Sequence, residues 1–102
     1  MARRVEWTAI ALDDLEQIAA YITRDSANYA ASFVREAMDA ARSLSDFADR
    51  GRVVPEVGDE HVRELFVGSY RLMYETTPDA VIVLAIIHGA RDRIPRGHFD
   101  ER

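Results

Sequence analysis

A short polar break in the N-terminal half most constrains how this chain can fold. Residues 24–28 (RDSAN) separate two segments whose apolar side chains recur at helical spacing. Two amphipathic helices with so short a link should pack antiparallel, as a helical hairpin. We expect the first helix from residue 9 to about residue 24, capped by Thr8. The second should follow the break, capped by Ser26, and run to about residue 46.

Each expected helix carries one apolar stripe that has to be buried. The stripe of the first helix comprises Ala11, Leu15, Ile18, Ala19 and Ile22. The stripe of the second comprises Ala30, Val34, Ala37, Met38, Ala41 and Leu44. One face of a sheet is the large apolar surface that the rest of the chain can offer to both stripes.

The C-terminal half has the pattern of a three-stranded antiparallel meander. RELFV and YRLMYET alternate between apolar and polar residues on either side of Gly68-Ser69, a pair that suits a tight hairpin turn. A second turn over residues 77–79 (TPD) leads into AVIVLAIIH, residues 80–88. This last segment is almost continuously apolar, as expected of a strand that is covered on both faces.

An N-terminal strand completes the predicted sheet. Residues 3–8 (RRVEWT) alternate, with Val5 and Trp7 on one side, whereas residues 46–61 contain two glycines and a proline and are predicted to be an irregular connection. The order is therefore strand, helix, helix, strand, strand, strand. We predict a single α+β domain over residues 1–102, with both helices packed on one face of an antiparallel four-stranded sheet.

The hairpin register predicts where the side chains of its strands point. With Gly68-Ser69 as the turn, Phe66 lies opposite Arg71 and Leu65 lies opposite Leu72. An apolar set then shares the side that the helices should cover: Leu65, Val67, Tyr70, Leu72 and Tyr74.

Arg71 projects from the opposite, open side of this predicted hairpin, together with Glu64, Phe66 and Glu75. Two interpretations stay open. The guanidinium group is either free to meet a macromolecular partner or held in a cross-strand ion pair with Glu64 or Glu75, an interaction worth less than about 1 kcal/mol at a surface. Alternation places Arg63 on the side that the helices should cover. It stands at the start of its strand, however, where its long side chain can extend past the edge of the sheet.

Charge and composition narrow the classes of function. The net charge is −5, and all 13 basic residues are arginine. An acidic chain is a poor candidate for binding nucleic acid by itself, because that binding depends on neutralising phosphates. There is no cysteine and no apolar run long enough to span a membrane, so we expect a cytoplasmic protein without disulfides. His61, His88 and His98 have no metal-ligand spacing, and we expect no metal or cofactor.

The segment after the last predicted strand contains the one locally basic run. Arg91, Arg93 and Arg96 follow Gly89, with Asp92 as the acidic residue among them. This run is either a solvated tail or a surface for an anionic target. His88, at the end of the strand, is either a structural residue or an acid or base.

Three stretches together resemble a known family of toxins. They are VEWTAIALDDLEQIAAYI, GRVVPEVGDEHVRELFVGSYRLMY and VIVLAIIHGARD. The whole chain resembles the ParE branch of the ParE/RelE superfamily, the toxic halves of bacterial type II toxin–antitoxin pairs. This resemblance implies the fold derived above. It also implies one of two activities, since RelE-type members cleave mRNA on the ribosome and ParE-type members inhibit DNA gyrase with no known catalytic step.

For a nuclease, the resemblance would assign catalysis to Arg63, Arg71, His88 and Arg91. Arg71 and Arg91 match arginines that serve the scissile phosphate in RelE-like enzymes, and Arg63 lies near a position that those enzymes fill with lysine. The lysine-rich patch and the C-terminal catalytic tyrosine of that type have no clear counterpart here. We therefore expect a gyrase inhibitor with no catalytic residues, and we expect Arg71, Arg91 and Arg93 to contact the target. A ribosome-dependent mRNA endonuclease remains the alternative.

The resemblance also implies a protein partner. A ParD-like antitoxin should neutralise the toxin in a hetero-oligomeric complex, through a segment that folds on its surface. Tyr21, Tyr29 and Phe33 are the candidate antitoxin contacts on the outer surfaces of the predicted helices, although core packing would explain each of them equally well.

Overall fold

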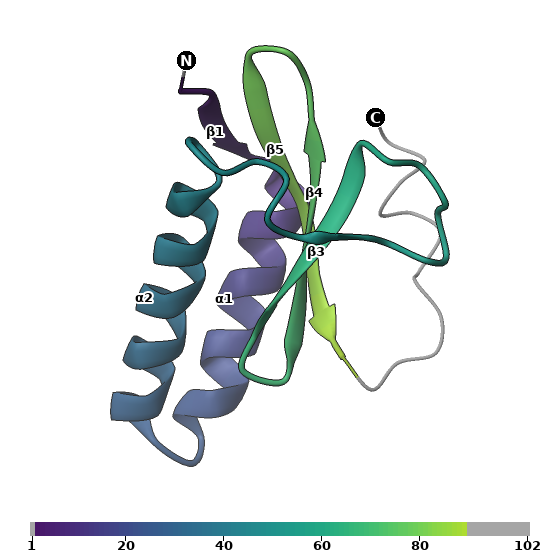
Figure 1. Ribbon diagram of the computed structural model, residues 1–102. Coiled ribbons are helices and arrows are strands. Elements are labelled where there is room, and N and C mark those ends of the chain that lie inside the picture. The colour runs from purple at the N-terminus through teal and green to yellow at the C-terminus, as the bar shows by residue number, and fades with distance from the viewer. Residues whose placement is uncertain (1, 90–102) are drawn as a thin grey trace.

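A computed structural model describes residues 2–89 (Figure 1). Its elements in chain order are β1 (Arg4–Trp7), α1 (Ala9–Thr23), α2 (Ala27–Ser43), β2 (Arg52–Val53), β3 (Val62–Val67), β4 (Tyr70–Thr76) and β5 (Ala80–His88). No helix in this part of the chain is both long enough and apolar enough to cross a membrane.

Both helices have the N-cap residues that the sequence predicts, and α2 starts at Ala27, directly after its cap. The Thr8 side chain accepts a hydrogen bond from the backbone N–H of Ala11, and the Ser26 side chain accepts one from Tyr29, so each helix has a capped N-terminus. α1 and α2 lie side by side on the same face of the sheet (Figure 1), which confirms the hairpin.

The buried stripe of α2 differs from the prediction at one step. Phe33 is 3% exposed and belongs to the core, whereas Met38 is 37% exposed. The residues buried in α2 are Ala30, Phe33, Ala37 and Ala41. These positions have helical spacing. Because α2 contains many alanines, two neighbouring stripes are similarly apolar, and the sequence does not distinguish which of them faces the sheet.

The sheet is mixed and has five strands, in the order β1-β5-β4-β3-β2. The strands β3, β4 and β5 pair antiparallel in chain order, as predicted. However, β1 pairs parallel with β5, and the two-residue β2 adds a fifth strand beside β3. The prediction of a purely antiparallel four-stranded sheet is therefore wrong. Alternation identifies a strand but not its neighbour, and β2 is too short to alternate.

The β3–β4 hairpin has the predicted register. Val67 pairs with Tyr70, and Phe66 pairs with Arg71. Gly68 adopts a positive φ of 58°, a left-handed conformation that glycine reaches without a steric penalty. The side chains of each strand are therefore assigned to the correct faces by the sequence.

The two faces of the sheet are covered differently. The helices bury the larger apolar cluster, which includes Leu65, Leu72 and Tyr74. On the other face, the segment that contains β2 folds back over the sheet and buries a smaller cluster: Val54, Val62, Met73, Leu84 and Ile87, with Val57 packed against it. The second face is thus partly covered, although Phe66 on it is 57% exposed, and this cover determines the surroundings of Arg71.

Candidate functional site

Arg71 is enclosed by carboxylates. Its Nη1 and Nη2 atoms donate to the two carboxylate oxygens of Glu56 at 2.9 and 2.8 Å, and its Nε donates to Oε1 of Glu64 at 2.6 Å. The residue is only 4% exposed. All three guanidinium nitrogens of Arg71 therefore already donate to carboxylates, two of them to Glu56 in the bidentate geometry that arginine prefers.

Glu64 is the centre of this network. Its side chain has no exposed surface, and its second oxygen accepts from Nε of Arg52 at 2.5 Å. Two carboxylates thus meet two guanidinium groups in an alternating row, which we call the ion-pair row: Glu56, Arg71, Glu64 and Arg52. Burying a charge is tolerated when it is paired and hydrogen-bonded, and this row meets that condition.

The pKa shifts follow from the same contacts. The hydrogen bond from Arg71 is the largest cause that lowers the pKa of Glu56, against an opposing effect of burial. The hydrogen bond to Glu56 is in turn the largest cause that raises the pKa of Arg71. Each group therefore holds the other in its charged form.

The expectation that Arg71 presents a free cation is wrong. Its side chain does lie on the face opposite the helices, and its pairing with Glu64 confirms the alternative of an ion pair within the hairpin. The additional partner, Glu56, comes from the segment that folds over this face. Strand parity predicts the face of a side chain but not what later covers that face.

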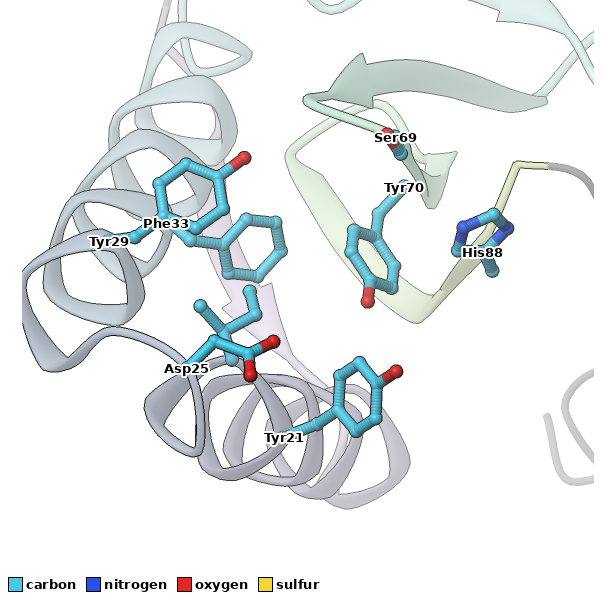
Figure 2. A pocket seen from close by; sticks show the side chains of 8 residues that line it. Tyr21, Asp25, Tyr29, Phe33, Ser69, Tyr70 and His88 are labelled. Atoms are coloured by element: carbon cyan, nitrogen blue, oxygen red, sulfur yellow. The ribbon is translucent and has the colours of Figure 1, made fainter.

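A pocket lies on the other side of the sheet, where the α1–α2 turn approaches the end of β5. Its volume is about 230 Å³, and eight residues line it: Tyr21, Ile22, Asp25, Tyr29, Phe33, Ser69, Tyr70 and His88 (Figure 2). We call this the aromatic pocket. It is smaller than the roughly 300–1,000 Å³ of sites for drug-sized ligands, so its volume suits a side chain.

The rings of the aromatic pocket support one another. Tyr70 makes edge-to-face contacts with Phe33 at 5.2 Å and with His88 at 5.3 Å between ring centroids. Tyr21 and Tyr29 are 62% and 59% exposed, which places them at the surface as predicted for a partner contact. Phe33 is buried, so its predicted exposure is wrong, although it still lines the pocket.

The family model that describes the ParE toxin of type II toxin–antitoxin systems, parDE, matches residues 5–93. This chain belongs to the ParE toxin family. No curated protein matches the sequence significantly.

Two solved toxin–antitoxin structures share the ParE fold of this chain. The chromosomal ParDE system from P. aeruginosa superimposes with a TM-score of 0.69 and 20% identity, over 85% of this chain and 96% of that one. The RelBE2 toxin–antitoxin complex from Mycobacterium tuberculosis gives a TM-score of 0.62 and 20% identity, over 89% and 95%. The fold therefore occurs in systems that carry the ParE name and in systems that carry the RelE name.

Within residues 2–89, the described residues that a nuclease would use, Arg63, Arg71 and His88, do not meet. Tyr70 pairs with His88 across β4 and β5, so the next residue, Arg71, projects from the opposite face to His88. Arg63 donates to the backbone oxygens of Glu60 and Gly51 at 3.1 and 2.9 Å, which is a structural role at the rim. Arg91 and Arg93 lie outside the described residues. Among residues 2–89 there is no group of side chains that could hold a metal ion.

Sequence reasoning missed several participants in both sites. Glu56 and Arg52 lie in the segment predicted as irregular, where no periodicity assigns a direction to a side chain. Asp25 and Ser69 belong to turns and join the aromatic pocket only because the two turns meet in space. The register did place Glu64 beside Arg71, and this was the one signal available for the ion-pair row.

Proposed function

We propose that this ParE-family chain is the toxin of a type II toxin–antitoxin pair that inhibits DNA gyrase by binding to it. The observation that carries the proposal is the enclosure of Arg71 by Glu56 and Glu64. A phosphate-cleaving site needs cations directed at the place where negative charge develops. Here the matching arginine already binds two carboxylates, which supports a binding protein rather than a nuclease.

The position of His88 supports the same proposal. A general acid or base must lie within hydrogen-bond reach of the reacting atoms. His88 lines the aromatic pocket on the helix-covered face, whereas Arg71 lies on the other face. A phosphate held by one of these residues would be separated from the other by the sheet.

We propose further that a ParD-like antitoxin neutralises the toxin in a cytoplasmic complex. Both solved structures described above are toxin–antitoxin systems. Tyr21 and Tyr29 offer exposed aromatic surface beside the aromatic pocket, and tyrosine is among the residues enriched at protein interfaces. Arg91 and Arg93 remain the proposed contacts to gyrase, because Arg71 is enclosed.

A supercoiling assay with purified DNA gyrase tests this function. Added protein should stop the conversion of relaxed to supercoiled plasmid, and the double variant Arg91→Ala with Arg93→Ala should weaken the inhibition. Arg96→Ala is the matched control, since it removes an arginine from the same run. Unimpaired supercoiling at a large molar excess of protein would reject the proposal.

A further inference from the structure

The aromatic pocket combines ring faces with one negative charge. Figure 2 shows the Asp25 carboxylate and the Tyr70 hydroxyl group directed into the same space, with the Tyr21 ring at its edge. Among residues 2–89, no cation forms a salt bridge with Asp25. A carboxylate beside aromatic faces is a chemical environment that favours a cation.

We infer that the aromatic pocket receives a basic side chain of the antitoxin, an arginine or a lysine. The inference rests on the proposed function, because it specifies how the proposed partner is anchored. It assigns the carboxylate of Asp25 as the counter-charge and the rings of Tyr21, Tyr29 and Tyr70 as the walls of the site.

An internal contact places a guanidinium group against the ring of Tyr21, three residues earlier in the chain. The Cζ atom of Arg24 lies 5.9 Å from the centroid of the Tyr21 ring, within the range of a cation–π interaction. Arg24 is not among the residues that line the pocket, so the pocket itself is left for a second cation. Planar guanidinium groups stack on aromatic rings better than ammonium groups do, which favours arginine over lysine.

The size and rigidity of the pocket fit one side chain. Its volume of about 230 Å³ can enclose the end of an arginine but is small for a larger ligand. The Tyr70 ring is held between Phe33 and His88 by two edge-to-face contacts, so it needs little reordering when a cation binds.

The charge of the toxin favours the same partner chemistry. Within residues 2–89, fifteen acidic side chains outnumber nine arginines. A negative surface attracts a basic segment over long range and accelerates its association. The net charge of residues 2–89 therefore favours a protein partner with a basic segment over nucleic acid.

The first test uses a capped amino acid as the probe. Nα-acetyl-arginine methylamide should shift the ring resonances of Tyr21, Tyr29 and Tyr70 in an NMR titration, whereas the uncharged citrulline analogue should not. Asp25→Asn should weaken this binding about fivefold, the size expected for a partly exposed ion pair. Asp39→Asn is the matched control, because Asp39 is an exposed acid on α2 that pairs with Arg42. Equal shifts with arginine and citrulline, or none with either, would overturn the inference.

The second test uses the proposed ParD-like antitoxin as the probe. Asp25→Asn should weaken the complex at least tenfold, because an interface desolvates the charge pair. Replacing the anchoring arginine or lysine of the antitoxin by glutamine should then cost affinity with wild-type toxin but little with the Asp25→Asn variant. Equal affinity of wild-type and Asp25→Asn toxin would overturn the inference. Inhibition of gyrase by Asp25→Asn toxin is measured in parallel, so that a failure of the pocket and a failure of the proposed function are told apart.

Discussion

The two faces of the sheet bury their side chains by different chemistry. The helix-covered face is filled by aliphatic and aromatic side chains from α1, α2 and three strands. The opposite face has a smaller apolar cluster and, beside it, the ion-pair row under the β2 segment. Apolar packing tolerates small changes of shape, whereas a buried charge depends on each of its partners.

Adjacent residues of β4 allow this comparison within one strand. Leu72 faces the helices and Arg71 faces the β2 segment, and both are buried. Substitutions at these two positions therefore probe the two faces with the same backbone and nearly the same depth.

Leu72→Ala should have the largest effect on stability. Leu72 has no exposed surface, and truncation of such a residue loses buried apolar area and leaves a cavity, at a cost of about 3–4 kcal/mol. Leu12→Ala is the control, because Leu12 is 45% exposed on α1 and should lose less than about 1 kcal/mol. Urea denaturation of both variants measures the difference. Similar losses at the two sites would mean that the helices do not seal this face.

Arg71→Ala should lower the free energy of unfolding by about 3 kcal/mol, because it leaves the buried carboxylate of Glu64 with Arg52 alone. Arg42→Ala removes an arginine from an exposed pair with Asp39 and should change the stability by less than about 1 kcal/mol. If both substitutions gave the same small change in urea midpoint, the ion-pair row would be a surface feature.

Tyr74→Phe should cost about 2 kcal/mol on the helix-covered face. The Tyr74 hydroxyl donates to the backbone oxygen of Ala48 at 2.7 Å and accepts from the N–H of Gly51 at 3.0 Å, and the variant leaves both buried groups unpaired.

The same hydroxyl group makes the stability of the fold depend on pH. Burial is the main cause that raises the pKa of Tyr74, so its contribution to the free energy of unfolding is present below the ordinary pKa of about 10 and is lost as the pH rises past it. Alkaline titration of the unfolding free energy should therefore be less steep in the variant. An unchanged slope would contradict the burial of this hydroxyl group.

Glu56→Gln should have the smallest effect, about 1 kcal/mol near neutral pH, because Glu56 is partly exposed and Glu64 still pairs with Arg71. Arg71 lowers the pKa of Glu56, so the stabilisation exists above the ordinary pKa of about 4.5 and disappears as the pH falls through the lower, folded-state value. Wild type and variant should thus differ near pH 7 and converge in acid. A difference that persists in strong acid would show that the charge of Glu56 is not the cause.

The sequence predicted most of the helix-covered face, apart from Phe33 and Met38 of α2, but not the segment that covers the other face. Gly68-Ser69 fixes the hairpin register, and from it the buried positions of Leu65, Leu72 and Tyr74 follow by alternation. The stripe of α1 is equally clear, with Ala11, Leu15 and Ile22 buried. The hairpin register depends on a local turn, and the buried positions of α1 depend on a periodic pattern. Both kinds of signal can be read from a single sequence.

The surroundings of Arg71 could not be predicted in the same way. Its face was correct, but Glu56 lies 15 residues earlier in a segment without periodicity, and only the tertiary fold brings the two together. The parallel pairing of β1 with β5 is likewise a contact between distant parts of the chain. The aromatic pocket itself was not predicted. The sequence indicated that Tyr21 and Tyr29 are exposed, and Asp25 and Tyr70 join them because the α1–α2 turn meets the start of β4.

The fate of mRNA in a translating extract tests most directly the claim that Arg71 holds the fold together and does not bind phosphate. Wild-type protein, at the highest concentration used in the gyrase assay, should leave the message intact. Cleaved message that appears with wild type and disappears with a folded Arg71→Ala variant would contradict the account, because the guanidinium would then have to leave Glu56 and Glu64 to reach a phosphate.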